Sequence, residues 1–116
     1  MYKLVKRLRS NNKKIFYHAT SKDNLGSILY NGLIAGSQGC IFMTEKEEDA
    51  IKFLALRLIP EIVTIKIRVY KEDYDKIQET FEHDPSFFKC KAFGYFGNIP
   101  AENIEACKIY TNPFVM

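Results

Sequence analysis

The most regular alternation of apolar and polar residues in the chain runs from Glu61 to Tyr70. From Val63 onward the apolar residues occupy every second position and are Val63, Ile65, Ile67 and Val69, with Ile62 at the strand entry. The polar residues between them are Thr64, Lys66 and Arg68. This period of two predicts a strand with one buried and one polar face. Shorter apolar runs predict further strands at 15–17, 40–43, 77–82, 89–96 and 105–110.

A helical period follows the first of these strands. The apolar residues that share one face of this predicted helix are Leu25, Ile28, Leu29 and Leu33. Thr20 and Asp23 have the spacing of a capping box, which predicts the start of the helix. Gly32 stands where a glycine commonly ends a helix. The loop at 36–39 then leads to the next strand.

A second helical period lies between the strands predicted at 40–43 and 61–70. Its apolar stripe consists of Ala50, Ile51, Leu54, Ala55 and Leu58. Thr44 and Glu47 predict a second capping box, and Pro60 predicts the end of the helix. The acidic run at 45–49 fits a solvated first turn, because the helix dipole favours carboxylates there.

The order of these elements indicates a fold class. Strands outnumber helices and the two main helices come early, which predicts an α+β fold with a mostly antiparallel sheet or two small sheets. Residues 71–76 predict a turn or short helix, and residues 84–88 a loop. With 116 residues, 47% of them hydrophobic, the chain can form one domain with a substantial core.

Charge divides the chain into a basic leader, 1–14, and a mildly acidic domain, 15–116. All charged residues of the leader are basic, namely Lys3, Lys6, Arg7, Arg9, Lys13 and Lys14. Such an arm binds phosphate backbones or anionic surfaces. The alternative is a solvated tail, which is common at chain ends.

Several classes of protein are disfavoured by what the sequence lacks. The chain has no apolar run of about 18 residues and no signal-peptide core, so we expect no membrane association. Cys40, Cys90 and Cys107 form no CxxC pair, which predicts free thiols in a reducing, cytoplasmic compartment. The two histidines, His18 and His83, lie far apart and match no metal motif, so we expect no metal site.

His18 is the most informative candidate for chemistry. It closes the strand predicted at 15–17, directly before the first helix. A histidine at such a position is often a structural residue with satisfied hydrogen bonds. A nucleophilic pair of His18 with Cys40 or Cys90 is a further alternative, because sequence alone does not place these side chains in space.

Three segments in fixed order carry a family resemblance: "YHATSKDNLGSILYNGL" at 17–33, "GCIFMTEKEEDA" at 39–50 and "YFGNIPAENI" at 95–104. Together they resemble the histidine branch of the ADP-ribosyltransferase superfamily. That branch includes poly(ADP-ribose) polymerase catalytic domains, RNA 2′-phosphotransferases and DNA-targeting ADP-ribosyltransferase toxins. The resemblance covers roughly residues 15–110 and implies a compact split antiparallel sheet with a cleft that holds NAD.

The resemblance also implies roles for individual residues at an NAD site. His18 would hydrogen-bond the adenosine ribose, and the backbone at Ala19 would hold the nicotinamide amide. The Thr20 hydroxyl would add a contact. An imidazole can accept from or donate to a ribose hydroxyl, and a small residue lets the backbone approach a ring. NAD is therefore the expected cofactor.

Two positions depart from the polymerase pattern. The tyrosine that stacks on nicotinamide corresponds to Ile41, and Phe42 would replace it if the strand register shifted by one residue. The catalytic glutamate corresponds to Phe93. These departures argue against chain elongation. Arg57, Arg68 and Lys91 are possible basic substitutes, and Arg68 with His18 and Phe42 forms the expected catalytic set.

Three functions follow from this resemblance. The first is an enzyme that transfers a single ADP-ribosyl group from NAD to a macromolecule, either nucleic acid or protein. The second is a catalytically inactive module of the same fold that binds nucleic acid or a partner protein. The third is RNA 2′-phosphotransferase activity, for which the chain is short and lacks the leading basic-histidine motif.

Overall fold

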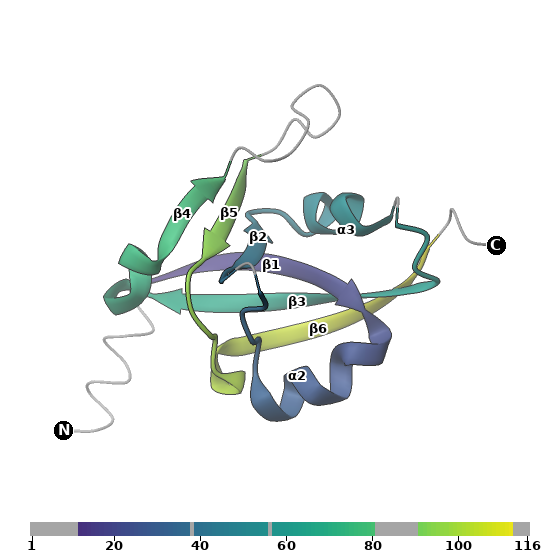
Figure 1. The fold of residues 1–116 in the computed structure, drawn as a ribbon, viewed down its shortest axis with the longest axis horizontal. Coiled ribbons are helices and arrows are strands. Elements are labelled where there is room, and N and C mark those ends of the chain that lie inside the picture. The colour runs from purple at the N-terminus through teal and green to yellow at the C-terminus, as the bar shows by residue number, and fades with distance from the viewer. Residues whose placement is uncertain (1–11, 38, 56, 81–90, 113–116) are drawn as a thin grey trace.

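The structure is a computed structural model that describes residues 12–37, 39–55, 57–80 and 91–112. Within these ranges the strands form one antiparallel sheet of six in the order β4-β5-β2-β1-β3-β6 (Figure 1). The strands are β1 Lys13–Ser21, β2 Ile41–Thr44, β3 Glu61–Tyr70, β4 Ile77–Thr80, β5 Ala92–Tyr95 and β6 Ile104–Thr111. The helices are η1 Lys22–Asn24, α2 Leu25–Asn31, α3 Glu47–Ala55, η2 Lys71–Lys76 and η3 Ala101–Asn103. The predicted α+β class with an antiparallel sheet and two main helices is confirmed.

Strand β3 is the centre of the sheet's longer half. It pairs with β1 from Lys13↔Tyr70 to Ser21↔Ile62, and with β6 on its other side. The bounds predicted for this strand are those observed, and its alternating apolar side chains are buried. Period-two burial of β-branched residues explains why this strand could be predicted from the sequence.

The two faces of the sheet are covered by different helices (Figure 1). On one face, here called the core face, Ile28 of α2 packs with Phe16, Ile65 and their neighbours. On the opposite face, here called the α3 face, Leu54 and Ala55 pack against Ile62. Because side chains alternate along a strand, consecutive residues of β3 contribute to opposite faces.

The sheet has a long half and a short half that meet at β1 and β2. The long half consists of β1, β3 and β6, with 9, 10 and 8 residues, and the short half consists of β2, β5 and β4, with 4 residues each. Within the described chain the register between β1 and β2 is the single pair Tyr17↔Thr44. We call this junction the seam.

Both predicted capping boxes are wrong. Ser21, not Thr20, caps η1, and its Oγ accepts from the Asp23 backbone N–H at 3.3 Å. Thr20 lies within β1, where its hydroxyl oxygen accepts from the Asn24 side-chain amide at 2.9 Å. The cause is that β1 continues to Ser21, beyond the predicted strand end.

At the second helix, the Thr44 hydroxyl donates to the Lys46 carbonyl at 2.7 Å instead of capping the helix. The Glu47 carboxylate turns to the sheet instead, where it accepts from Thr64 at 2.7 Å and from Tyr110 at 2.9 Å. Glu47 therefore bonds to strand residues that are distant in sequence, and not to the backbone at the start of its own helix.

Two residues predicted to lie on inner helix faces are exposed. Leu29 is 55% exposed, and Leu58 is 62% exposed. Leu58 lies beyond the end of α3 and adopts a positive φ of 57°, so it no longer follows the helical stripe. Leu33 is buried, but outside α2, where it forms a bridge with Ile99.

Other boundaries shifted by a few residues. Lys13 and Lys14, assigned to the leader, belong to β1. The polar segment 71–76 is the 3₁₀ helix η2, in agreement with the predicted turn or short helix. The rest of the leader and the predicted loop at 84–88 lie outside the described residues. Among the described helices, none combines the length and apolar character needed to span a membrane.

Candidate functional site

The three segments that carry the family resemblance are neighbours in space. Tyr17 of the first pairs with Thr44 of the second. The second pairs with the third through β2 and β5. The first and third meet at Leu33 and Ile99, whose backbone N–H and C=O groups exchange two hydrogen bonds of 2.8 Å. The three segments therefore adjoin one another in the structure.

Gly32 makes the contact between the first and third segments possible. Its φ of 80° lies in the region that favours glycine, and a Cβ there would lie 2.2 Å from the Ile99 carbonyl oxygen. Its N–H donates to the Ile28 carbonyl at 2.8 Å, which ends α2. Gly32, which was predicted to end the helix, therefore also lets its own backbone approach the segment at 98–100.

His18 lies inside β1 and not at its end, because the strand continues to Ser21. The residue is half-buried and lies on the core face, two positions after Phe16 and opposite Ile65. Its Nδ1 is 2.7 Å from the Phe42 carbonyl oxygen. This hydrogen bond crosses the seam and joins the long half of the sheet to the short half.

Burial keeps the His18 ring neutral, and the hydrogen bond to Phe42 selects its tautomer. Burial lowers the pKa of His18, and the hydrogen bond to Phe42 only partly offsets this effect. The imidazole is therefore neutral near pH 7. A carbonyl oxygen only accepts, so Nδ1 carries the hydrogen and Nε2 retains its lone pair. The described structure gives this side chain a single hydrogen bond, which leaves Nε2 able to accept another.

Ile41 and Phe93 lie on the same face of the sheet as His18. Both belong to or pack against the core cluster, and Ile41 is only 4% exposed. The Phe93 ring packs edge-on against Phe16, with 5.4 Å between ring centroids. The positions that the family fills with tyrosine and glutamate are therefore apolar here and occupied by packing contacts.

Phe42 does not replace the missing tyrosine by a register shift. Pairing of β2 with β5 is continuous from Ile41↔Tyr95 to Thr44↔Ala92. This register places the Phe42 side chain opposite Gly94 on the α3 face, away from His18. Phe42 contributes its backbone carbonyl to the site instead of its ring.

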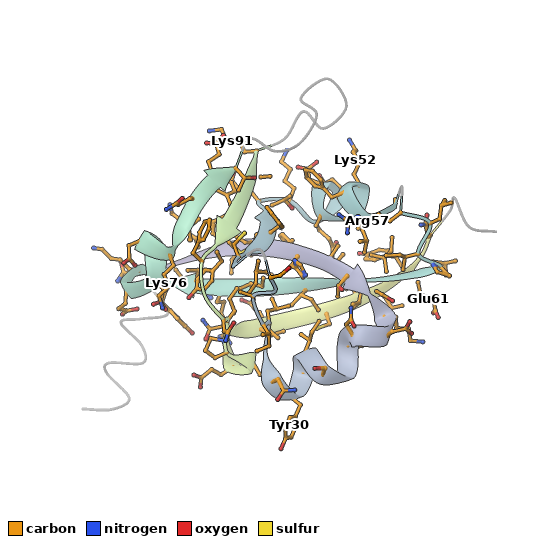
Figure 2. The ribbon with its side chains drawn as sticks, viewed as in Figure 1. Tyr30, Lys52, Arg57, Glu61, Lys76 and Lys91 are labelled. Carbon is orange, nitrogen blue, oxygen red and sulfur yellow. The ribbon has the colours of Figure 1, made fainter. Side chains whose placement is uncertain are left out.

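The structure places Arg68 and His18, two members of the expected catalytic set, on opposite faces of the sheet. Arg68 lies on the α3 face, opposite Ile15 in β1, and its Nη2 donates to the Glu102 carbonyl at 2.7 Å. The other basic substitutes, Arg57 and Lys91, lie after the end of α3 and before the start of β5, respectively (Figure 2). Both are exposed.

The remaining expected contacts are divided between the faces. Thr20 follows His18 on the core face, and its hydroxyl oxygen already accepts from Asn24. The Ala19 side chain packs on the α3 face against the cluster of Leu54, Ala55 and Ile62. Only its backbone is therefore suited to a ligand contact.

Sequence reasoning missed Glu79. This exposed residue of β4 pairs directly with Phe93 of β5, on the face that Ile77 and Phe93 turn to the core. Side chains directly opposite each other in an antiparallel pair have Cβ atoms about 4.5–5.5 Å apart. A carboxylate therefore stands one strand beyond the family's glutamate position. No local signal could reveal it, because the pairing of β4 with β5 is a tertiary contact.

Neither a metal nor a nucleophilic thiol is favoured by the described side chains. Within the described ranges, no three His, Cys, Asp or Glu residues are grouped so that they could hold a metal ion. Cys40 Sγ lies close to Gly94, toward the β5 side of the sheet, and Cys90 falls outside the described residues. Burial raises the pKa of Cys107, which disfavours its thiolate.

Comparison with known proteins adds no further assignment: no family model matches the chain, and no curated protein matches its sequence.

Proposed function

We propose that this chain binds NAD beside His18 and transfers a single ADP-ribosyl group to a macromolecular target. The observation that supports this most is the hydrogen bond from His18 Nδ1 to the Phe42 carbonyl. It holds the ring at the seam and leaves Nε2 as an acceptor for a ribose hydroxyl. NAD is proposed as the ligand because the three segments resemble the histidine branch of the ADP-ribosyltransferase superfamily, which binds NAD.

The proposed reaction breaks the bond between ribose C1′ and the nicotinamide nitrogen. Nicotinamide leaves with the bonding electron pair, and positive charge develops on the ribose ring. A nucleophile of the target then bonds to C1′ and loses its proton. His18 acts here by positioning the dinucleotide, since it accepts from a hydroxyl and does not touch the breaking bond.

A carboxylate near the ribose would stabilise the developing cation. Phe93 cannot supply one, but Glu79 stands next to it on the same face. In our proposal the flexible Glu79 side chain reaches over Phe93 toward the ribose. The apolar pair Ile41 and Phe93 supplies no second carboxylate to activate a sugar hydroxyl, which supports single transfer over chain elongation.

The packing of Ile41 and Phe93 also favours a second candidate function. Since both residues are engaged in the core cluster or against it, the same site suits a module that binds the dinucleotide without cleaving it. Arg68, one of the basic residues considered as substitutes for the glutamate, lies on the opposite face from His18 and therefore gives no support to RNA 2′-phosphotransferase activity. We do not propose that third activity.

The test is to measure NAD binding by calorimetry and nicotinamide release by chromatography on the same samples. His18→Ala should abolish both signals. Glu79→Gln should keep binding and lower release by about a hundredfold, the scale of one electrostatic group at a transition state. Glu45→Gln is the matched control, because Glu45 is exposed and lies before α3, and it should behave as wild type.

Binding of NAD without release in the wild-type protein would support the binding module and contradict transfer. Absence of binding at millimolar NAD would contradict both candidates. Equal release by Glu79→Gln and wild type would remove Glu79 from the mechanism while leaving the role of His18 intact.

A further inference from the structure

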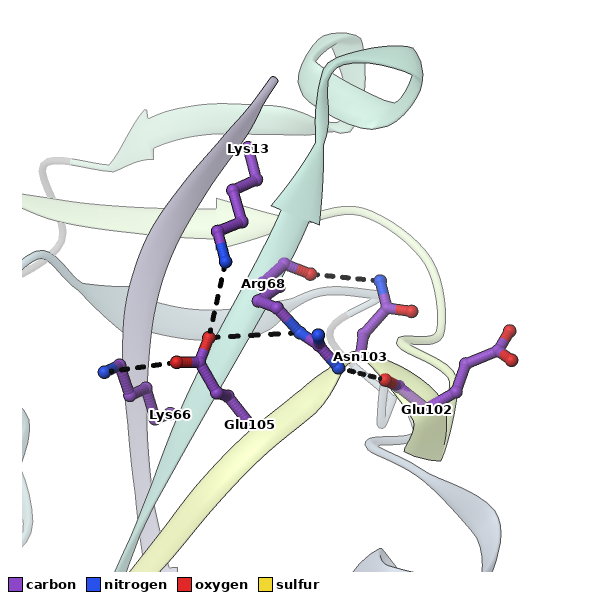
Figure 3. A network of polar contacts seen from close by, with 6 residues as sticks. All are labelled: Lys13, Lys66, Arg68, Glu102, Asn103 and Glu105. Atoms are coloured by element: carbon purple, nitrogen blue, oxygen red, sulfur yellow. Dashed lines mark hydrogen bonds and ion pairs between the residues drawn. The ribbon is translucent and has the colours of Figure 1, made fainter. Parts of the chain in front are cut away.

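The part of the α3 face that lies beyond α3 carries a cluster of cations around one acid (Figure 3). Lys66 Nζ lies 3.4 Å from Glu105 Oε1, and Lys13 Nζ lies 3.8 Å from Glu105 Oε2. Arg68 Nε lies 3.9 Å from the same Oε2 atom. We call the face formed by Lys13, Tyr17, Lys66 and Arg68 the basic strip.

Strand register explains why these residues meet. Lys66 and Arg68 alternate with the buried core residues of β3, so they share the face opposite His18. A bulge in β6 leaves Glu105 between the pairs Lys66↔Ala106 and Ile67↔Ile104. The extra residue turns its carboxylate toward the cations of the adjacent strands.

Helix α3 covers only the other end of this face. Ile62 and Thr64 are buried, because Leu54 packs against the first and Glu47 bonds to the second. Lys66 and Arg68, farther along the same strand, keep 35% and 28% of their side chains exposed. The basic strip therefore faces solvent while the rest of the face is packed.

The charges of the strip are not balanced. One carboxylate faces three cations, which leaves an excess of positive charge. Among the residues that the structure describes, none is a hydrogen-bond partner of the buried Arg68 Nε, because its distance to Glu105 is too long for a hydrogen bond. Glu105 therefore does not satisfy all the donors of the three cations.

An aromatic ring lies among these cations. Tyr17 is half-buried, opposes Lys66 in the register of β1 and β3, and shares its face. Cations combined with an aromatic side chain on one surface are typical of sites that bind single-stranded nucleic acid, since phosphates contact the cations and bases stack on the ring. An anionic partner without bases would contact the cations but would not stack on Tyr17.

The chain's own leader is a poor occupant for this surface. The residues that precede Lys13 carry Lys3, Lys6, Arg7 and Arg9 and no acid, so they repel the strip. A polyanion is attracted both by the strip and by the basic residues that precede Lys13 in the sequence. We infer that the basic strip binds a single-stranded nucleic acid. This inference goes beyond the proposed NAD chemistry and does not depend on it.

The experiment measures binding of the full chain to a fluorescein-labelled oligodeoxythymidine by fluorescence anisotropy, between about 50 and 200 mM salt. Lys66→Gln and Arg68→Gln should each weaken binding on the order of fivefold and reduce the log–log salt slope by about 0.7. Tyr17→Leu should weaken binding by about tenfold with an unchanged slope, since stacking is lost and no charge is removed.

Glu105→Gln gives the sharpest test because its effect has the opposite sign. Removing the only carboxylate of the cluster should tighten binding on the order of fivefold and steepen the salt slope. Loss of folding cannot produce such a gain. Lys52→Gln is the charge-matched control: Lys52 is exposed on α3 and Figure 2 shows it pointing outward, so it should match wild type.

Two results would overturn the inference. The first is that Glu105→Gln and Arg68→Gln bind the oligonucleotide as the wild-type protein does, which would make the cluster an internal ion-pair network. The second is equal competition by polyglutamate or by phosphatidylserine vesicles, which would make the strip a general anionic contact. His18→Ala should bind the oligonucleotide normally, so failure of the NAD proposal is distinguished from failure of this one.

Discussion

The two halves of the sheet differ in how they are stabilised. In the long half, β3 lies between two partners and its residues Ile62, Val63, Ile65 and Ile67 are fully buried. In the short half, β4 is an edge strand of 4 residues, and none of them is buried. His18 therefore lies on a strand that pairs along its whole length with the buried strand β3, while its hydrogen-bond partner, Phe42, lies on the short strand β2, in the half that ends at the exposed strand β4.

The energetic contrast follows from burial. A fully buried Val or Ile side chain contributes roughly 1.5–3 kcal/mol relative to an exposed one. The long half contains several such side chains on one strand, whereas the outermost strand of the short half contributes only the partly buried Ile77 to the core. We therefore expect β4, at the edge of the short half, to open locally at a lower free energy than β3.

The largest expected effect comes from Ile67→Ala in the long half. Its side chain is fully buried, so we expect the free energy of unfolding to fall by about 2–5 kcal/mol. Ile77→Ala, at a partly buried site on β4, should cost less than half as much. Urea denaturation measures the free energy of unfolding of both variants. Equal losses would show that the two halves contribute alike to stability.

Gly32→Ala should have the next largest effect, about 1–3 kcal/mol, because the added Cβ meets the Ile99 carbonyl at a positive φ. Hydrogen exchange should show loss of protection at the Leu33 and Ile99 amides before the β3 amides. Gly26→Ala is the control: no atom lies within 4 Å of its added Cβ, and alanine favours a helix by about 0.5–1 kcal/mol. Equal destabilisation by both variants would contradict the role given to Gly32.

Glu47→Gln tests the contact between α3 and the long half, and we expect a loss of about 1 kcal/mol at neutral pH. Burial raises the pKa of Glu47, but hydrogen bonds from Thr64 and Tyr110 with nearby Lys108 and Lys66 outweigh it and lower the pKa. The stabilisation by the ionised Glu47 carboxylate is therefore complete above the ordinary pKa of glutamate. It is lost as the pH falls through the lowered pKa of Glu47 in the folded protein.

Urea denaturation at a series of acidic pH values measures this loss. The wild-type protein should lose stability more steeply on acidification than Glu47→Gln does. Parallel curves for the two proteins would show that Glu47 does not hold α3 to the sheet in the charged form.

The smallest effect concerns His18 at the seam. Because burial lowers its pKa, the unfolded chain binds the proton more readily than the folded protein does. The free energy of unfolding should therefore decrease as the pH falls from about 6.5 toward the lowered pKa. An NMR titration of the ring should give a midpoint below that of a free histidine, and a midpoint above it would contradict the neutral, Nδ1-protonated ring.

Much of the fold could be predicted from local patterns, and the errors have identifiable causes. The strand at 61–70 was correct because its alternation continues from Val63 to Val69, and Gly32 was correct because the positive φ at the end of the helix favours glycine. Both capping boxes failed. Thr20 was already part of β1, and Glu47 found partners on the sheet that are distant in sequence.

The candidate site was predicted less completely than the fold. His18 could be singled out because it lies in the first of the three segments that carry the family resemblance, although its hydrogen bond to Phe42 could not be foreseen. Arg68 was expected beside His18 but lies on the opposite face of the sheet. The sequence could not show this, because the face depends on how the two strands pair. Glu79 was missed because its neighbour, Phe93, belongs to another strand.

The order of elements, the α+β class and the alternation of β3 were properties of the sequence itself, because side-chain direction along a strand or helix has a fixed period. Tertiary structure alone decided which strands became neighbours and where β6 bulged, because pairing between distant segments depends on the packing of the whole chain. That difference explains why His18 was recognisable from the sequence, whereas the carboxylate of Glu79 and the basic strip emerged only from strand register.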